Sequence, residues 1–256
     1  MQYISKDEFD FLWSNVDNYF NFGIVVEQSD CVFDVGANIG VFAHRCYELT
    51  LGNLDIHCFE PIKPLYDVCK NNISEFGIVK NVGMSSKNET VTFTYYPNYT
   101  LLSGKDRSIL DEDKHLLSEI VTRNTTDISA EWFDEQVVGG NYNCNIIRIS
   151  DYINQNCIDE INLLKIDVEK EELEVLRGID EDHWDKIKQI VIKVHDIDGR
   201  ADYINNMLLS KGFEVYINYK DPPEFSLFKN SKNSFDFPEN NEPLYMFYCT
   251  KNLISN

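Results

Sequence analysis

The chain has 256 residues, of which 43% are hydrophobic, 13% aromatic and 26% charged. These proportions are typical of folded globular proteins and exclude a disordered chain, and the length suits one large α/β domain. With 23 Lys and Arg against 43 Asp and Glu, the formal net charge of −20 repels polyanions at long range. We therefore expect neither nucleic acid nor an anionic membrane surface as a partner.

The seven cysteines are odd in number and form no C-x-x-C pair, and most lie within apolar runs. This pattern is typical of buried thiols in a reducing compartment and predicts neither disulfides nor a zinc framework. No run approaches the roughly 18 apolar residues that span a bilayer, and the first residues lack the segments of a secretory signal. We predict a cytoplasmic protein without membrane insertion.

The first predicted element is an amphipathic helix within residues 1–29. Phe9, Trp13, Val16 and Phe20 recur there at spacings of four, three and four, which is the period of one helix face. We expect this segment to form an N-terminal helical cap over the core.

Short apolar runs then alternate with helical patterns. The helices are expected at 41–50 and near 63–76, and the strand-like runs are CVFDV, LDIHCFE, IVKNVG, INLLKIDV and QIVIKVH. Short buried strands separated by helices predict right-handed crossovers and a doubly wound, mostly parallel sheet in one α/β domain, residues 1–256.

Two segments interrupt this alternation. Residues 97–140 carry mixed charge and weak strand signals, and we interpret them as a helical insertion, a candidate lid, in which Ser103 and Arg107, with Tyr96 just before it, are weaker candidates for substrate contact. Residues 220–243 concentrate Pro, Asn and Ser and predict a long loop. The runs that flank this loop, GFEVYIN and PLYMFYC, are expected to pair as a hairpin.

The stretch CVFDVGANIGVFA predicts a strand, a glycine-bearing turn and a helix. Such a turn lies at the carboxyl end of the sheet, where open α/β folds bind ligands. The glycines allow a ligand to approach bare main chain, and the start of the helix offers N–H donors. The candidate ligand-binding residues of this turn are Asp34, Gly36, Ala37, Asn38 and Gly40.

The next strand ends at Glu60, where a carboxylate accepts hydrogen bonds from a ribose diol. The dinucleotide fingerprint G-x-G-x-x-G is missing because Asn38 stands two residues after Gly36. A carboxylate at Asp34 repels a pyrophosphate but suits the ammonium and sulfonium groups of S-adenosylmethionine. A purely structural turn with a capping Asn, and a nicotinamide-dependent dehydrogenase, are the alternatives for this motif.

The segments DVGANIGVFA and FEPIKPLYDVCKNN together resemble the FkbM family of S-adenosylmethionine-dependent methyltransferases. The segments KIDVEKEELEVLRGI and WDKIKQIVIKVHD are similar to O-methyltransferase domains of polyketide and nonribosomal peptide synthases. The resemblance implies a seven-stranded, Rossmann-like methyltransferase fold, with residues 34–40 around the methionine moiety and Glu60, followed by Pro61, at the ribose. It also implies, in general terms, adenine contacts from Gly83, Met84 and Ser85. Lys170 departs from the family, in which many members have Gly.

Methyl transfer to a hydroxyl requires a base for its proton, and a histidine suits this role near neutral pH. His195 is our candidate because it ends the apolar run QIVIKV and so lies at the carboxyl edge of a central strand. Glu169 is expected to orient His195, and Asp167 to contact the methionine end or the acceptor. The next acids, Glu171, Glu172 and Glu174, are expected on a solvated helix face.

Three readings of this set of residues remain open. The leading one is an S-adenosylmethionine-dependent O-methyltransferase that releases S-adenosylhomocysteine and acts on a small-molecule, glycan-precursor or carrier-bound hydroxyl. In the second, Asp167, Glu169 and His195 hold a divalent metal that acidifies the acceptor. The third is a catalytically silent S-adenosylmethionine-binding module. The oligomeric state and the acceptor are not determined by the sequence.

Overall fold

The computed structural model describes residues 1–98, 100–105, 138–220 and 243–251. The body of the predicted insertion, including Arg107, and nearly all of the predicted loop at 220–243 therefore lie outside the described residues. No helix in the described part of the chain is both long enough and apolar enough to cross a bilayer.

A seven-stranded sheet forms the centre of the molecule, with the strand order β10-β11-β9-β8-β1-β2-β3. Its bounds are β1 Cys31–Val35, β2 Asp55–Phe59, β3 Ile78–Lys80, β8 Leu163–Ile166, β9 Gln189–His195, β10 Glu214–Lys220 and β11 Leu244–Thr250. Strands β3, β2, β1, β8 and β9 run parallel, and β11 runs antiparallel to both β9 and β10. The predicted doubly wound sheet and its terminal hairpin are confirmed.

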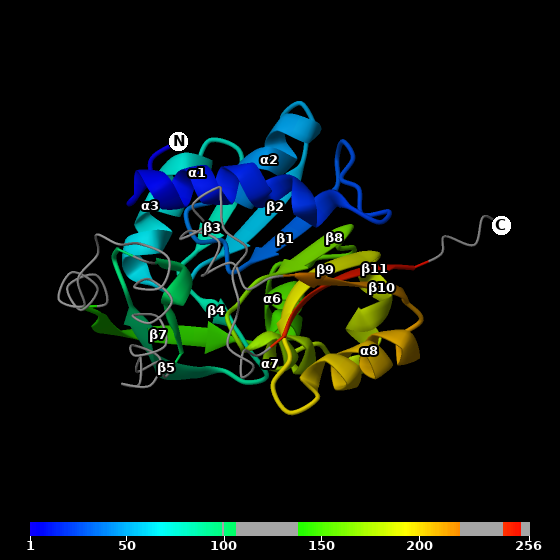
Figure 1. Ribbon diagram of the computed structural model, residues 1–256. Coiled ribbons are helices and arrows are strands. Elements are labelled where there is room, and N and C mark those ends of the chain that lie inside the picture. The colour runs from blue at the N-terminus through cyan, green and yellow to red at the C-terminus, as the bar shows by residue number, and fades with distance from the viewer. Residues whose placement is uncertain (99, 106–137, 221–242, 252–256) are drawn as a thin grey trace, which may run out of the picture.

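Helices cover both faces of this sheet (Figure 1). On one side lie α1 Lys6–Asn15, the 3-10 turn η1 Val16–Phe20, α2 Val41–Leu49 and α3 Lys63–Ile73. On the other side lie α6 Ile149–Gln155, α7 Glu172–Arg177, η3 Glu181–Lys186 and α8 Arg200–Ser210. Because side chains alternate between the two faces of the sheet along each strand, the strands contribute to two apolar cores, one on each face.

A second sheet of four strands, in the order β4-β7-β5-β6, lies beside the first and was not predicted. Its bounds are β4 Gly83–Met84, β5 Glu89–Tyr95, β6 Gly104–Lys105 and β7 Gly140–Ile147, and η2 Thr100–Leu102 precedes β6. The run IVKNVG is thereby divided, because β3 stays in the main sheet while β4 pairs with β7. The described ends of the predicted insertion thus belong to this sheet.

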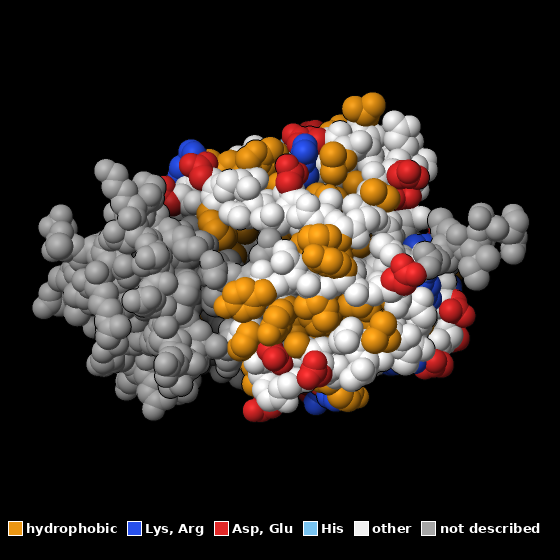
Figure 2. Space-filling view, turned by 45° about the vertical axis from the view of Figure 1, so that its right-hand side comes forward, with side chains coloured by type: hydrophobic (Ala, Val, Ile, Leu, Met, Phe, Trp, Pro, Cys, Tyr) orange, Lys and Arg blue, Asp and Glu red, His pale blue; other side chains and the backbone are white. Residues whose placement is uncertain are grey.

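The β10 edge of the main sheet carries exposed apolar side chains. Tyr216, Ile217 and Tyr219 of β10 are 41–57% exposed, and Phe22 stacks on Tyr216 with ring centroids 3.7 Å apart. Figure 2, whose view brings this side forward, shows hydrophobic side chains gathered on the surface. The Phe22 ring covers one face of Tyr216, while β10 stays an edge strand of this sheet.

Candidate active site

A cavity of about 1070 Å³, its open mouth included, lies at the carboxyl edge of the main sheet. Its wall combines residues that the sequence predicted for the cofactor with two predicted for catalysis. Those cofactor candidates are Gly36, Ala37, Asn38, Glu60, Pro61, Gly83, Met84 and Ser85, and the catalytic candidates are Asp167 and Glu169. Asp34, Gly40 and His195 are not part of this wall.

Glu60 presents a buried carboxylate to the cavity. Its Oε2 accepts a hydrogen bond from the Asn38 amide at 2.9 Å, and its Oε1 accepts one from the Ile62 amide at 2.9 Å. Burial raises the pKa of Glu60 to about 7, although both amide bonds act in the opposite direction. Each oxygen keeps a lone pair with which to accept from a diol.

Asp34 differs from its expected place. Its carboxylate is fully buried on the β1 face next to Lys165, its register partner on β8, and Oδ1 lies 2.8 Å from Lys165 Nζ. Lys165 also donates to the Gly36 carbonyl oxygen at 2.7 Å. The Asp34 charge is therefore neutralised beneath the turn, and the argument that it faces a cationic ligand directly does not hold. Its role is to anchor the lysine that fixes the turn.

The two glycines of the turn are required by protein packing. A Cβ at Gly36, where φ is +77°, would lie 1.9 Å from the Asp167 carbonyl oxygen. A Cβ at Gly40, where φ is +87°, would lie 2.8 Å from Ile73 of α3. Gly36 still lines the cavity, whereas Gly40 caps α2 and allows it to pack closely on α3.

A line of buried charges follows the carboxyl ends of β8 and β9. Tyr19 donates a hydrogen bond to Asp167 Oδ2 at 2.5 Å, and Lys193 Nζ lies 2.6 Å from both Asp167 Oδ1 and Glu169 Oε1. The burial of Asp167 is outweighed by Lys193 and Lys165, so the pKa of Asp167 falls below its usual value. The lysine ammonium takes the position between two carboxylates that a divalent metal would need.

His195 lies at the end of this line and is only 3% exposed. Its Nδ1 is 2.8 Å from Glu172 Oε1, and its Nε2 is 3.3 Å from Glu169 Oε2. Burial acts to lower the pKa of His195, but the Glu169 charge and the hydrogen bond with Glu172 outweigh it and raise the pKa above 6.5. The imidazole is therefore held between two carboxylates, with Glu169 on the cavity side.

The expectation that Glu172 lies on a solvated helix face is wrong. It is fully buried, and besides His195 it pairs with Arg200, whose Nη1 lies 3.1 Å from Oε2. Glu171, by contrast, lines the cavity and pairs with Lys105 of β6 at 3.1 Å. The residue that orients the His195 ring through Nδ1 is thus Glu172. The run EKEE did not indicate this, because the buried Glu172 follows two partly exposed acids, Glu169 and Glu171.

The loop that carries Glu169 has an unusual backbone. Glu169 has φ of +37° and Lys170 has φ of +73°, and side-chain-bearing residues rarely adopt this region. Glycine adopts this region readily, whereas a lysine at position 170 has to be held in it by its surroundings. Such backbone is held only where the surroundings determine it, here at the wall of the cavity.

The N-terminal segment forms one wall of the cavity. Leu12, Val16 and Tyr19 line it, and Glu8 accepts a hydrogen bond from the Leu101 amide at 3.0 Å. Ser103 also lines the cavity, whereas Tyr96 is buried next to it. Leu12, Tyr19, Lys105, Lys165 and Lys193 were not among the predicted site residues. For Lys165 and Lys193 the available signal was a cation inside an apolar strand.

Ligand atoms suited to a metal converge in two groups within the described residues, and neither contains Asp167, Glu169 or His195. Together with the position of Lys193, this geometry gives no support to the metal-assisted alternative at this cavity.

Comparison with known proteins shows the family of this chain. The model of the methyltransferase FkbM domain matches residues 34–215. This chain belongs to the FkbM methyltransferase family. It is 31% identical, over 86% of its length and 87% of the relative's, to the 31-O-demethyl-FK506 methyltransferase FkbM of Streptomyces tacrolimicus.

Two further matches place the family assignment in context. The AMB antimetabolite synthetase AmbE of Pseudomonas aeruginosa is 30% identical over 78% of this chain, which spans 10% of that protein. The crystal structure of the methyltransferase FkbM from Methylobacillus flagellatus shares the fold with a TM-score of 0.54 and 16% identity, over 92% of this chain and 48% of that one. The predicted family is confirmed, and the chain is a methyltransferase.

Proposed function

We propose that this methyltransferase uses S-adenosylmethionine to methylate a hydroxyl of a small-molecule, glycan-precursor or carrier-bound intermediate. One observation carries the proposal: a single cavity is lined both by Glu60 with the turn amides and by Glu169 of the His195 pair. The name of the Streptomyces tacrolimicus relative, which specifies a demethylated oxygen, supports O-methylation.

The residues present fit S-adenosylmethionine. Glu60 would hold the ribose hydroxyls through its remaining lone pairs, and Gly83 to Ser85 would hold the adenine end. The wall contains the carboxylates of Glu60, Asp167, Glu169 and Glu171 against two lysines, an excess of negative charge that suits a cation better than a diphosphate. When bound, the cofactor supplies a methyl group activated by its sulfonium.

The chain itself aligns the acceptor and removes its proton. Glu169, at the cavity wall, accepts the proton of the acceptor hydroxyl and passes it to His195 Nε2, which lies 3.3 Å from Glu169 Oε2. Glu172 holds the imidazole through Nδ1 and stabilises the imidazolium that forms. Leu12 and Val16 of the N-terminal segment, together with Leu101, close the cavity with apolar side chains and limit the entry of water.

The net charge of −20 favours a small or carrier-bound acceptor over nucleic acid, and we retain a cytoplasmic location as part of the proposal.

The cofactor part is tested by calorimetric titration of the full chain with S-adenosylhomocysteine and, separately, with NAD. We expect heat of binding with S-adenosylhomocysteine only. Binding of NAD without binding of S-adenosylhomocysteine would contradict the proposal and favour a dehydrogenase.

The catalytic part is tested with His195→Ala. Loss of a general base predicts a decrease in kcat of about 10²–10⁴-fold, with the affinity for S-adenosylhomocysteine unchanged within about twofold. Formation of S-adenosylhomocysteine from S-adenosylmethionine with a panel of secondary alcohols measures the rate. His44→Ala, a partly exposed histidine of α2 that does not line the cavity, is the control. An unchanged rate would remove His195 from the mechanism, and no turnover in the wild type with any acceptor would favour a silent module.

A further inference from the structure

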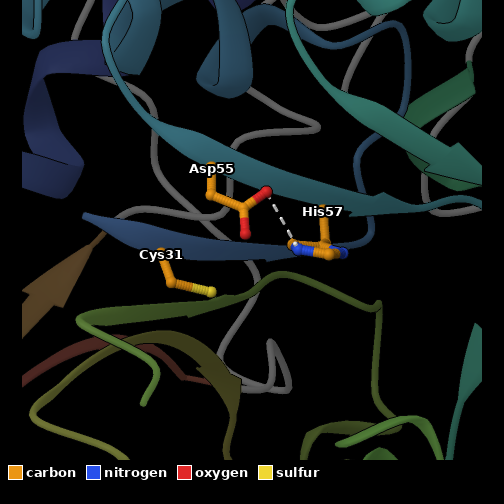
Figure 3. Close-up of side chains that lie close together, drawn as sticks. All are labelled: Cys31, Asp55 and His57. Atoms are coloured by element: carbon orange, nitrogen blue, oxygen red, sulfur yellow. Dashed lines mark ion pairs between the residues drawn. The ribbon is translucent and has the colours of Figure 1, made fainter. Parts of the chain in front are cut away.

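Cys31, Asp55 and His57 lie close together (Figure 3), near the amino ends of β1 and β2, whereas the cavity lies at the carboxyl edge of the sheet. Cys31 begins β1 and Asp55 begins β2, and the two residues are register partners. His57 follows two residues later, so its side chain lies on the same face of the sheet. One ligand-type atom from each of the three residues lies within 4.8 Å of the other two.

The His57 ring has one nitrogen held and one nitrogen available. Its Nδ1 is 2.8 Å from the hydroxyl of Tyr152 on α6, and the residue is 3% exposed. Its Nε2 is buried and has no hydrogen-bond partner among the described residues, although it lies 3.2 Å from Asp55 Oδ1. If Nδ1–H donates to Tyr152, the lone pair of Nε2 points toward Asp55 and Cys31. Metal-binding histidines are held in this way by a partner on the other nitrogen.

The surroundings of these side chains are negative. The partly buried Cys31 thiol lies in the electrostatic field of the carboxylates of Asp55, Asp30 and Glu160. A thiol beside three carboxylates is costly to ionise alone. A divalent cation reverses this, because one thiolate, one carboxylate and one neutral imidazole leave a complex with no net charge.

We propose that Cys31 Sγ, an Asp55 carboxylate oxygen and His57 Nε2 bind one Zn²⁺ ion, with water at the remaining position. Zn²⁺ accepts this mixture of S, O and N ligands in tetrahedral geometry. Two ligands about 2.1 Å from a tetrahedral ion lie about 3.4 Å apart, close to the observed separation of Nε2 and Oδ1. Binding forms a Zn–S bond and releases the thiol proton to solvent.

The second group of ligand-type atoms, Asp180, Asp182 and His183, does not support the same inference. Arg148 already pairs with Asp180, and the Ser150 hydroxyl lies 2.8 Å from His183 Nδ1. A cation there would compete with a guanidinium, whereas no cationic side chain is recorded in contact with the Cys31 group among the described residues.

The test uses the full chain after treatment with EDTA, titrated with Zn²⁺ and with Co²⁺ as a spectroscopic probe. We expect one Zn²⁺ per chain, a rise in Tm of a few degrees, and a thiolate-to-cobalt charge-transfer absorption. Cys31→Ser should abolish that absorption and weaken Zn²⁺ binding by at least about tenfold, because a ligand is lost. Cys157→Ser, which removes an exposed free thiol, is the control and should behave as wild type.

Two further variants keep the proposal falsifiable if Cys31→Ser folds poorly. Asp55→Asn should weaken Zn²⁺ binding while retaining the cobalt–thiolate absorption. Tyr152→Phe, which leaves the ring nitrogen without its partner, should weaken binding by about tenfold and also retain that absorption. Equal Zn²⁺ binding by the wild type and all three variants, or no charge-transfer absorption in the wild type, would overturn the proposal. S-adenosylhomocysteine binding reports on the cavity separately.

Discussion

Two pairs of histidine and carboxylate lie at opposite edges of one sheet, and their carboxylates differ in solvent exposure. His195 and Glu172 lie at the carboxyl edge, and both are almost fully buried. His57 and Asp55 lie at the amino edge, where the Asp55 side chain is 61% exposed. At the carboxyl edge both partners therefore belong to a closed charge network, whereas at the amino edge a buried histidine faces a carboxylate that is open to solvent. This difference predicts how strongly each edge responds to the loss of one partner.

The largest effect on stability is expected from Lys193→Met at the carboxyl edge. The variant leaves Asp167 and Glu169 buried without their shared ammonium, which should cost about 3–5 kcal/mol in the free energy of unfolding. Urea denaturation measures it. Lys63→Met is the control, since its partner Asp67 is exposed on α3 and the pair contributes less than about 1 kcal/mol.

The pH dependence of the stability that Lys193→Met loses tests the cause of that loss. The lowered pKa of Asp167 contributes stability above the unfolded pKa of about 3.9, and this contribution is lost as the pH falls through the folded value. The deficit of the variant should therefore narrow in acid. A deficit that is the same at all pH values would point to lost packing.

Glu172→Gln should have the next largest effect, because it removes the charge that holds both His195 and Arg200. We expect a loss of about 2–3 kcal/mol in stability near pH 6. The raised pKa of His195 contributes stability below about pH 6.5, and this is lost as the pH rises through the folded value, so the deficit should shrink in alkali.

The Glu172→Gln variant should also differ from the wild type in the pH dependence of kcat/KM. Since the base must be neutral to accept a proton, kcat/KM should rise with pH, and the rising limb should move to lower pH in the variant. A pH-rate profile checks this. An unmoved limb would show that Glu172 supports the fold without tuning the base.

Glu60→Gln probes the cofactor side of the same edge with a smaller expected effect. With a pKa of about 7, Glu60 becomes ionised between about pH 6 and about pH 8, and S-adenosylhomocysteine affinity should rise about tenfold over that range. The variant should bind more weakly and without this rise. Calorimetry at several pH values measures it, and Glu75→Gln on the surface is the control. A rise that persists in Glu60→Gln would assign it to another group.

Asp55→Asn, in metal-free protein, should have the smallest effect. Its partner His57 keeps the hydrogen bond with Tyr152, and the exposed carboxylate is screened by water, so we expect a change within about 0.5 kcal/mol. Urea denaturation in EDTA measures it. A loss as large as that of Glu172→Gln would show that the two edges do not differ.

The main sheet was predictable because its strands are short, apolar and separated by helices. The second sheet was missed although the run TVTFTY alternates as a strand does, because its partner strand begins 45 residues after β5 ends. No local pattern reports such a pairing.

The sequence brought many of the cavity-lining residues together but indicated few of their pairings. Glu60 and the turn line one cavity, as their places at strand ends suggest, and their roles in binding stay predictions. The neutralisation of Asp34 by Lys165, and the burial of Glu172, depend on register between separate strands and on the turn before α7. The sequence did not indicate the group of Cys31, Asp55 and His57 either, because these residues come close only through the pairing of β1 with β2.

The contact between Gly36 and the Asp167 carbonyl oxygen joins the two functional halves of the cavity. A Cβ at Gly36 would not fit against the Asp167 carbonyl oxygen, so the main chain of the turn after β1 lies directly against the main chain of the loop after β8. The separation of these two backbone segments is thereby fixed by covalent geometry and backbone packing. Rotamer changes in the surrounding side chains leave that backbone separation unaltered, and a ligand that lies across both segments must adapt to it.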